Sequence, residues 1–122
     1  MRNPSSPIAQ APQRELHERI AALQAAKAAR LDDEEVAALA ATLSDVTGEV
    51  WLFGSRVESG RRGGDIDVLI LTGEPAFETS RKVATRFYSL CEEKIDVVVF
   101  NPERLTTEQA DFLSRIHKVR LV

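Results

Sequence analysis

Two almost unbroken runs of branched apolar residues limit what this chain can fold into. They span Ile66–Leu71 and Ile95–Phe100, and each has the length and the composition of a strand covered on at least one face. Between them, the segment Phe77–Glu93 repeats its apolar residues at helical spacing, so we expect a helix that packs across the sheet. The sequence therefore predicts an α/β (α+β) protein in which helices flank a small mixed β-sheet.

The rest of the chain adds shorter elements of the same kinds. Residues 14–30 predict a leading helix with a thin apolar stripe, which we expect to pack on its own domain. A second helix begins at a capping box formed by Asp32 and Glu35 and continues until Gly48. The remaining predictions are a strand at Glu49–Phe53, a helix that starts at Thr106 and a short strand at Val119–Val122.

Length and composition set the expected domain organisation. With 122 residues the chain is long enough for one modest core, so we expect a single domain over residues 14–122. Residues 1–13 contain three prolines among Ser, Asn and Gln, and this composition predicts a flexible N-terminal tail.

The charge balance and the single cysteine argue against several classes of function. A formal net charge of -3 offers no general attraction for nucleic acid or anionic lipid, so we expect no direct nucleic-acid binding. Cys91 has no partner for an internal disulfide, and no run of about eighteen apolar residues occurs. These features predict a cytoplasmic protein that does not enter a membrane.

Carboxylates stand at the start of both apolar runs. Asp65 and Asp67 are two residues apart and would project from the same face of a strand, while Asp96 opens the next run. If the two strands are neighbours, the three carboxylates converge at one rim of the sheet. Converging acids repel one another unless cations neutralise them, and oxygen ligands suit Mg²⁺ or Mn²⁺. We favour a metal site over the alternative that these are ordinary solvated residues at strand ends.

A Gly-Ser turn precedes the acid pair. Gly54 and Ser55 end the first predicted strand, so exposed backbone N–H groups and the Ser55 hydroxyl would face the phosphate oxygens of a nucleotide. Arg56 adds a positive charge at this turn, and we predict that it contributes to nucleotide binding. For Arg61 and Arg62, phosphate or partner contact and a solvated loop are equally open.

In combination, the stretch Leu52–Ile70 and the segment Ile95–Val99 resemble the nucleotidyltransferase superfamily with a DNA polymerase β-like fold, in particular its minimal nucleotidyltransferase branch. Relatives usually have one more residue between the serine and the acid pair, and often a serine where this chain has Gly64. The resemblance implies a catalytic site with two metal ions. Asp65 and Asp67 would bind both metal ions, and Asp96 would bind the metal ion beside the attacking hydroxyl. Gly54 and Ser55 would hold the phosphates of the nucleotide.

The resemblance also implies a reaction and a partner. The reaction is Mg-dependent transfer of a nucleoside monophosphate, AMP from ATP, to a hydroxyl group. Minimal members often look like the antitoxin of a toxin–antitoxin system and modify a hydroxyl, typically a tyrosine, on a helical toxin of the HEPN class. Only 26 residues follow Asp96, so we expect such a protein partner to supply the acceptor surface, and residues 14–30 could dock it or a second copy.

Two alternatives to protein modification remain open at this point. The chain could neutralise its partner by occlusion, as a binding module that keeps the motif only to sense nucleotide or metal. It could instead modify a small molecule such as an antibiotic, although the missing acceptor domain makes this less favourable.

Overall fold

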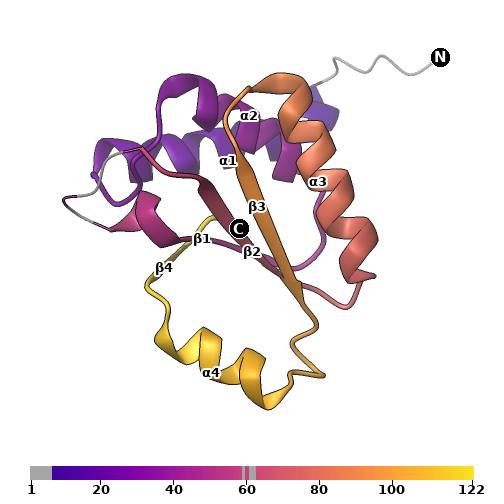
Figure 1. The fold of residues 1–122 in the computed structure, drawn as a ribbon. Helices are drawn as coiled ribbons and strands as arrows, with labels where there is room; N and C mark the ends of the chain where they lie inside the picture. Colours follow the sequence, from indigo (N-terminus) through magenta and orange to yellow (C-terminus); the bar gives the residue numbers. More distant parts are fainter. Residues whose placement is uncertain (1–6, 59, 61–62) are drawn as a thin grey trace.

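A four-stranded mixed sheet with helices on both sides forms the protein (Figure 1). The computed structural model describes residues 7–58, 60 and 63–122. The helices are α1 (Pro7–Ala25), α2 (Asp33–Leu43), α3 (Ala76–Leu90) and α4 (Thr107–Arg115), with a short 3₁₀ helix η1 (Gly54–Val57). The strands are β1 (Glu49–Phe53), β2 (Ile66–Leu71), β3 (Ile95–Phe100) and β4 (Lys118–Arg120).

The strand order is β3-β2-β1-β4. Strands β2 and β3 are parallel and are joined by α3, whereas β1 is antiparallel to both β2 and β4. The two apolar runs are therefore neighbouring strands, as the metal-site prediction requires. The mixed sheet with flanking helices confirms the predicted fold class.

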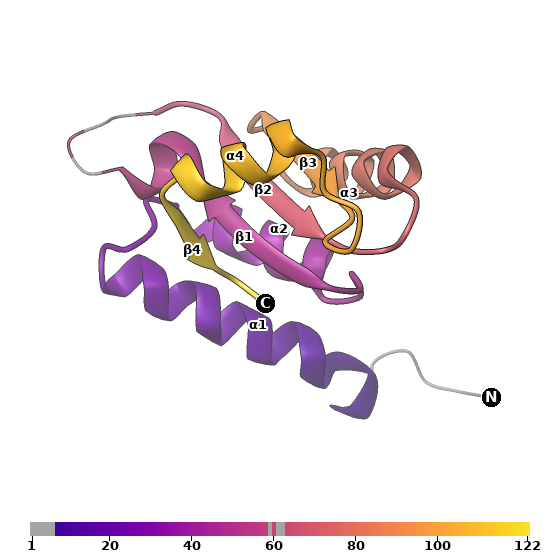
Figure 2. The same ribbon diagram turned by 90° about the horizontal axis from the view of Figure 1, so that it is seen from below.

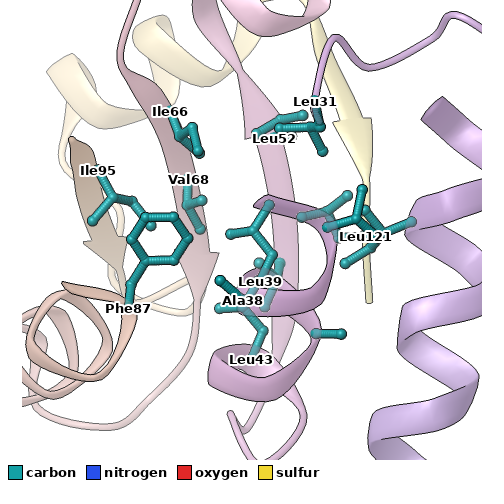
Figure 3. Packing of buried hydrophobic residues seen from close by; sticks show 14 of the residues in the cluster. Leu31, Ala38, Leu39, Leu43, Leu52, Ile66, Val68, Phe87, Ile95 and Leu121 are labelled. Atoms are coloured by element: carbon teal, nitrogen blue, oxygen red, sulfur yellow. The ribbon is translucent and has the colours of Figure 1, made fainter. Parts of the chain in front are cut away.

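The core lies between the sheet and the layer formed by α1, α2 and α3. Alternate residues of the strands point to this side, and Leu52 of β1 and Val68 of β2 are fully buried there. Figure 3 shows Leu39 of α2 and Phe87 of α3 directed toward these two strands. Since apolar burial is the main favourable term in folding, this side of the sheet carries most of the stability.

Among the described helices, α4 alone lies on the opposite side of the sheet (Figures 1 and 2). Phe112 of α4 makes edge-to-face contacts with Phe53 of β1 and Phe100 of β3, at ring-centroid distances of 5.6 Å and 5.9 Å. No residue of α4 is fully buried. This open side of the sheet is where the acidic residues of β2 and β3 lie, as described below.

Helix α1 differs from the helix predicted over residues 14–30. It begins at Pro7, because proline is tolerated in the first turn, where its missing N–H would have no partner in any case. It ends at Ala25, because Lys27 adopts a left-handed conformation (φ 62°) and Ala28 N–H donates to Leu23 C=O, which is a Schellman termination. The predicted tail is thus partly helical, and its residues 1–6 lie outside the described residues.

The first helix packs on its own domain, as predicted, since Leu16 and Ile20 belong to the core cluster. Helix α2 starts at the predicted capping box: the Asp32 carboxylate accepts from Glu35 N–H, and the Glu35 carboxylate accepts from Asp32 N–H. It ends at Leu43, earlier than the predicted stop before Gly48. In the described residues, no helix is long and apolar enough to cross a membrane.

A buried ion pair fixes η1 against α2. Arg56 is only 5% exposed, and its guanidinium donates to both carboxylate oxygens of Glu35, at 2.9 and 3.0 Å. The same guanidinium also donates to the backbone C=O groups of Arg30 and Gly64, at 2.9 and 3.0 Å. Three separate segments therefore meet at one side chain, which sets the position of the turn after β1.

The ionised form of Glu35 is favoured in the folded protein. Burial by itself raises the pKa of Glu35, but hydrogen bonds from Arg56 and from the Asp32 backbone, together with the positive charge of Arg56, outweigh it, so the pKa is lowered from its ordinary 4.5. This carboxylate therefore contributes stability that is complete above its unfolded-state pKa and is lost as the pH falls through the lowered value.

Replacing Glu35 by alanine should lower the free energy of unfolding by about 3–5 kcal/mol, because the charge of Arg56 would stay buried without its partner. Urea unfolding followed by circular dichroism measures this change. The matched control is Asp45→Ala, which removes the exposed ion pair with Arg86 (3.2 Å) and should cost less than about 1 kcal/mol. Equal losses in the two variants would contradict the role of the buried pair.

The difference in unfolding free energy between the parent protein and Glu35→Gln should shrink as the pH falls from about 7 to about 3. The lowered pKa of Glu35 gives this sign, because protonation at low pH removes the contribution that the glutamine variant already lacks. Parallel urea titrations across this range provide the measurement. A constant difference would show that the Glu35 charge does not matter for folding.

Candidate active site

Two carboxylates lie side by side on the open side of the sheet. Asp67 is the second residue of β2 and Asp96 the second residue of β3, and the parallel register pairs them directly. Ile66 and Ile95, the preceding pair, are buried on the helical side, so the alternation of the strands turns both aspartates to the other side. Asp65 stands just before β2. The structure thus brings together Asp67 and Asp96, and Asp65 immediately precedes the first residue of β2.

The Gly-Ser turn meets these acids through β1. Phe53, the last residue of β1, is paired with Asp67, so Gly54 follows at the rim of the sheet beside that carboxylate. Gly54 has φ 77°, and a Cβ placed on it would collide with Asp67 Oδ2. Only glycine allows the turn and the carboxylate to approach this closely.

A second close approach shapes the other side of the turn. Gly64 has φ 86°, and a Cβ placed on it would collide with the hydroxyl oxygen of Ser55. Arg30 supports the same turn, since its guanidinium donates to the C=O of Ser55 at 2.6 Å and to the C=O of Gly63 at 2.9 Å. Arg30 was not identified from the sequence. It contacts Ser55, which lies 25 positions further along the chain, and no pattern in the neighbouring residues predicts such a contact.

At Asp67, burial and repulsion from neighbouring acids act in the same direction. Burial raises the pKa of this carboxyl above its ordinary value, and the negative charges of Asp96 and Asp65 raise it further, while Arg56 opposes the shift. The three acids are therefore close enough to act on one another. A cation placed between them would relieve this repulsion.

The donor set fits a hard divalent cation, although the acids are not gathered into a finished cage. Within the described residues, no three Asp, Glu, His or Cys side chains form a ready metal cluster. Asp65 pairs with Lys94 instead, at 3.5 Å, where the Lys94 side chain is exposed and the Asp65 side chain is partly accessible to solvent. An exposed ion pair of this kind is weak and gives way easily to a stronger ligand. The oxygen chemistry of Asp67, Asp96 and Asp65 suits Mg²⁺ or Mn²⁺.

Arg56 makes its side-chain contacts within the protein, and the predicted nucleotide contact stays a prediction. Its guanidinium forms the buried pair with Glu35 and also donates to backbone acceptors. Arg56 is therefore a structural residue that holds the turn. Arg61 and Arg62 lie outside the described residues.

Among the described residues, the three acids are accessible from the surface. Asp96 is exposed, and Asp65 and Asp67 are half-buried. A pocket of about 600 Å³ lies behind η1, between Leu31, Val57 and other residues, and the three acids do not line it. We place the chemistry at the acids rather than in this pocket, because reactive groups are identified by their chemistry and convergence as well as by concavity.

Comparison with known proteins agrees with this geometry. The family profile of the nucleotidyltransferase domain matches residues 34–120, which include α2 except its first residue, the whole sheet, the Gly-Ser turn and all three acids. No curated protein matches the sequence. Since the matched region covers most of the chain, this protein belongs to the nucleotidyltransferase domain family, whose members act on nucleoside triphosphates.

Proposed function

We propose that this nucleotidyltransferase moves AMP from ATP to a hydroxyl group on a partner protein, with Mg²⁺, and that the partner is a helical toxin of the HEPN class. One observation carries the donor half of this proposal: the register of β2 with β3 sets Asp67 beside Asp96, and Gly54 packs directly on Asp67. Carboxylates and a phosphate-binding turn are thereby available at one rim of the sheet.

The chain's own residues divide the work of binding. Asp67, Asp96 and Asp65 would hold the divalent cations, which, when bound, neutralise phosphate charge and stabilise the attacking and leaving oxygens. Gly54 and Ser55 would bind the phosphates through backbone N–H groups and the Ser55 hydroxyl. Arg30 and Arg56 hold that turn in place through the backbone and Glu35 contacts described above. A fixed turn lowers the cost of orienting the triphosphate for attack.

The transfer step requires one proton acceptor. The hydroxyl oxygen of the acceptor bonds to the α-phosphorus, the bond from that phosphorus to the pyrophosphate oxygen breaks, and the hydroxyl proton leaves. Asp96 is the residue we assign to receive this proton. It is exposed at the open side of the sheet, so a hydroxyl arriving from outside can reach it.

The openness of the site supports a macromolecular acceptor. Small-molecule substrates are usually enclosed in pockets that cover most of their surface. Here the acids lie on a side of the sheet where, among the described helices, α4 alone packs, through the contact of Phe112 with Phe53. A partner protein can complete such a site by bringing its own walls, and the resemblance to antitoxin-like relatives suggests a tyrosine hydroxyl on a HEPN-class toxin.

Incubation of the two proteins with Mg²⁺ and ATP labelled at the α-phosphate should place covalent label on the partner, whereas ATP labelled at the γ-phosphate should not. Asp67→Asn should lower labelling by at least roughly a thousandfold, because it removes a carboxylate that would hold the cations that neutralise the phosphates. A tight complex without label would support occlusion instead. Label on an aminoglycoside, but none on protein, would support the antibiotic alternative.

Metal-free Asp67→Asn should have a melting temperature at least as high as that of the parent protein, because the change removes one of three mutually repelling carboxylates. Differential scanning calorimetry, with and without Mg²⁺, provides the measurement. We expect Mg²⁺ to raise the melting temperature of the parent protein only. Stabilisation of both proteins to the same extent would show that the cation binds away from Asp67.

Gly54→Ala should reduce transfer by at least roughly a hundredfold, since its methyl group would push the Asp67 carboxylate away from its position. The matched control is Gly60→Ala. Gly60 has a similar backbone conformation (φ 80°), but a Cβ there meets nothing within 4 Å. Both variants therefore share the conformational cost, and only Gly54→Ala adds the collision. Equal losses of transfer in the two variants would mean that the contact with Asp67 is unimportant.

A further inference from the structure

Strand β3 is an outer strand of the sheet, and beyond Asp96 it has little of the usual protection of a sheet edge. Outer strands expose unpaired backbone groups, and proteins commonly guard them with charges, prolines or short length. The other outer strand, β4, has only three residues and carries Lys118 and Arg120. In contrast, β3 has six residues, and the stretch Val97–Phe100 contains neither a charge nor a proline.

The hydrogen bonds show which groups of β3 face outward. Ile66 N–H donates to Lys94 C=O, and Thr72 N–H donates to Phe100 C=O. In a parallel ladder the backbone groups of every second residue bond to the neighbouring strand, so the N–H and C=O groups of Asp96 and Val98 also point toward β2. The residues between them, Ile95, Val97 and Val99, direct their N–H and C=O groups to the outer edge.

One of these three outward residues already has a partner. The Tyr88 hydroxyl lies 3.4 Å from both the N–H nitrogen and the C=O oxygen of Ile95. Among the described residues, no strand pairs with the outer edge of β3, so Val97 and Val99 present two N–H and two C=O groups to it. These four groups are arranged symmetrically about Val98.

Exposed aromatic side chains flank the same edge. Tyr88 of α3 is 48% exposed and marks the beginning of β3 through its contact with Ile95. Phe77 is 73% exposed and lies eleven residues earlier, on the same stripe of α3. Helix α3 packs against β3 (Figure 1), and the Tyr88 contact with Ile95 places one of these aromatic side chains at the outer edge.

We propose that the outer edge of β3 binds β3 of a second copy of this chain in antiparallel orientation, centred on Val98. The N–H and C=O groups of Val97 would then bond to the C=O and N–H groups of Val99 in the other copy. Val99 would bond in the same way to Val97 of the other copy, so that all four outward groups are satisfied. The antiparallel orientation sets Asp96 opposite Phe100 of the other copy. A parallel arrangement in register would instead place the two Asp96 charges next to each other, which disfavours it.

This proposal does not depend on transfer activity, and sedimentation equilibrium tests it. The parent protein should form dimers. Val98→Lys should raise the dissociation constant by roughly tenfold or more, because two like charges would lie directly opposite each other. Val98→Glu should do the same, and an equimolar mixture of the two variants should recover dimers through opposite charges. A monomeric parent protein, an unaffected variant or a failed recovery would overturn the proposal.

Hydrogen exchange provides a residue-level test with an internal control. The N–H groups of Val97 and Val99 should exchange at least roughly tenfold more slowly in the parent protein than in Val98→Lys. The N–H group of Val98 bonds to β2 and should stay protected in both, which also shows that the variant is folded. Unprotected Val97 and Val99 in the parent dimer would mean that the two copies meet elsewhere.

Discussion

The buried pair between Arg56 and Glu35 is the interaction on which the rest of the site depends. Strand β1 carries the chain to the sheet rim, and nothing in the strand itself dictates where the following turn goes. Arg56 determines this by reaching back to the first turn of α2, to the segment after α1 and to the residue just before the acid pair. The position of the Gly-Ser turn relative to α2 is therefore set by the hydrogen bonds of one side chain, Arg56.

The two charge clusters of this protein have opposite thermodynamic signs. At Glu35 an acid and a base neutralise each other in the interior, so the charges favour the folded state once both are present. At Asp67 like charges are held together on the surface, and folding has to bring them there against repulsion. The first cluster stabilises the fold, whereas the second would be stabilised by bound cations. The two clusters are linked through the Gly-Ser turn, because Arg56 holds this turn and Gly54 in the same turn contacts Asp67.

The sequence was informative wherever a local period determined the structure. The strands, the capping boxes and the common face of Asp67 and Asp96 follow from alternation, spacing and end signals over a few residues. The hydrogen bonds between Arg56 and Glu35 were not predicted, because the two residues lie 21 positions apart. Glu35 was correctly predicted to cap α2, but the same carboxylate also binds Arg56. The early start of α1 was missed because proline signals a helix start as readily as a loop.

Gly64 controls how the chain enters β2. Its backbone is left-handed, a conformation that glycine adopts at no steric cost. The Ser55 hydroxyl also fills the space that a side chain at position 64 would need. Any larger residue at this position would therefore have to displace the serine that we propose as a phosphate-binding group.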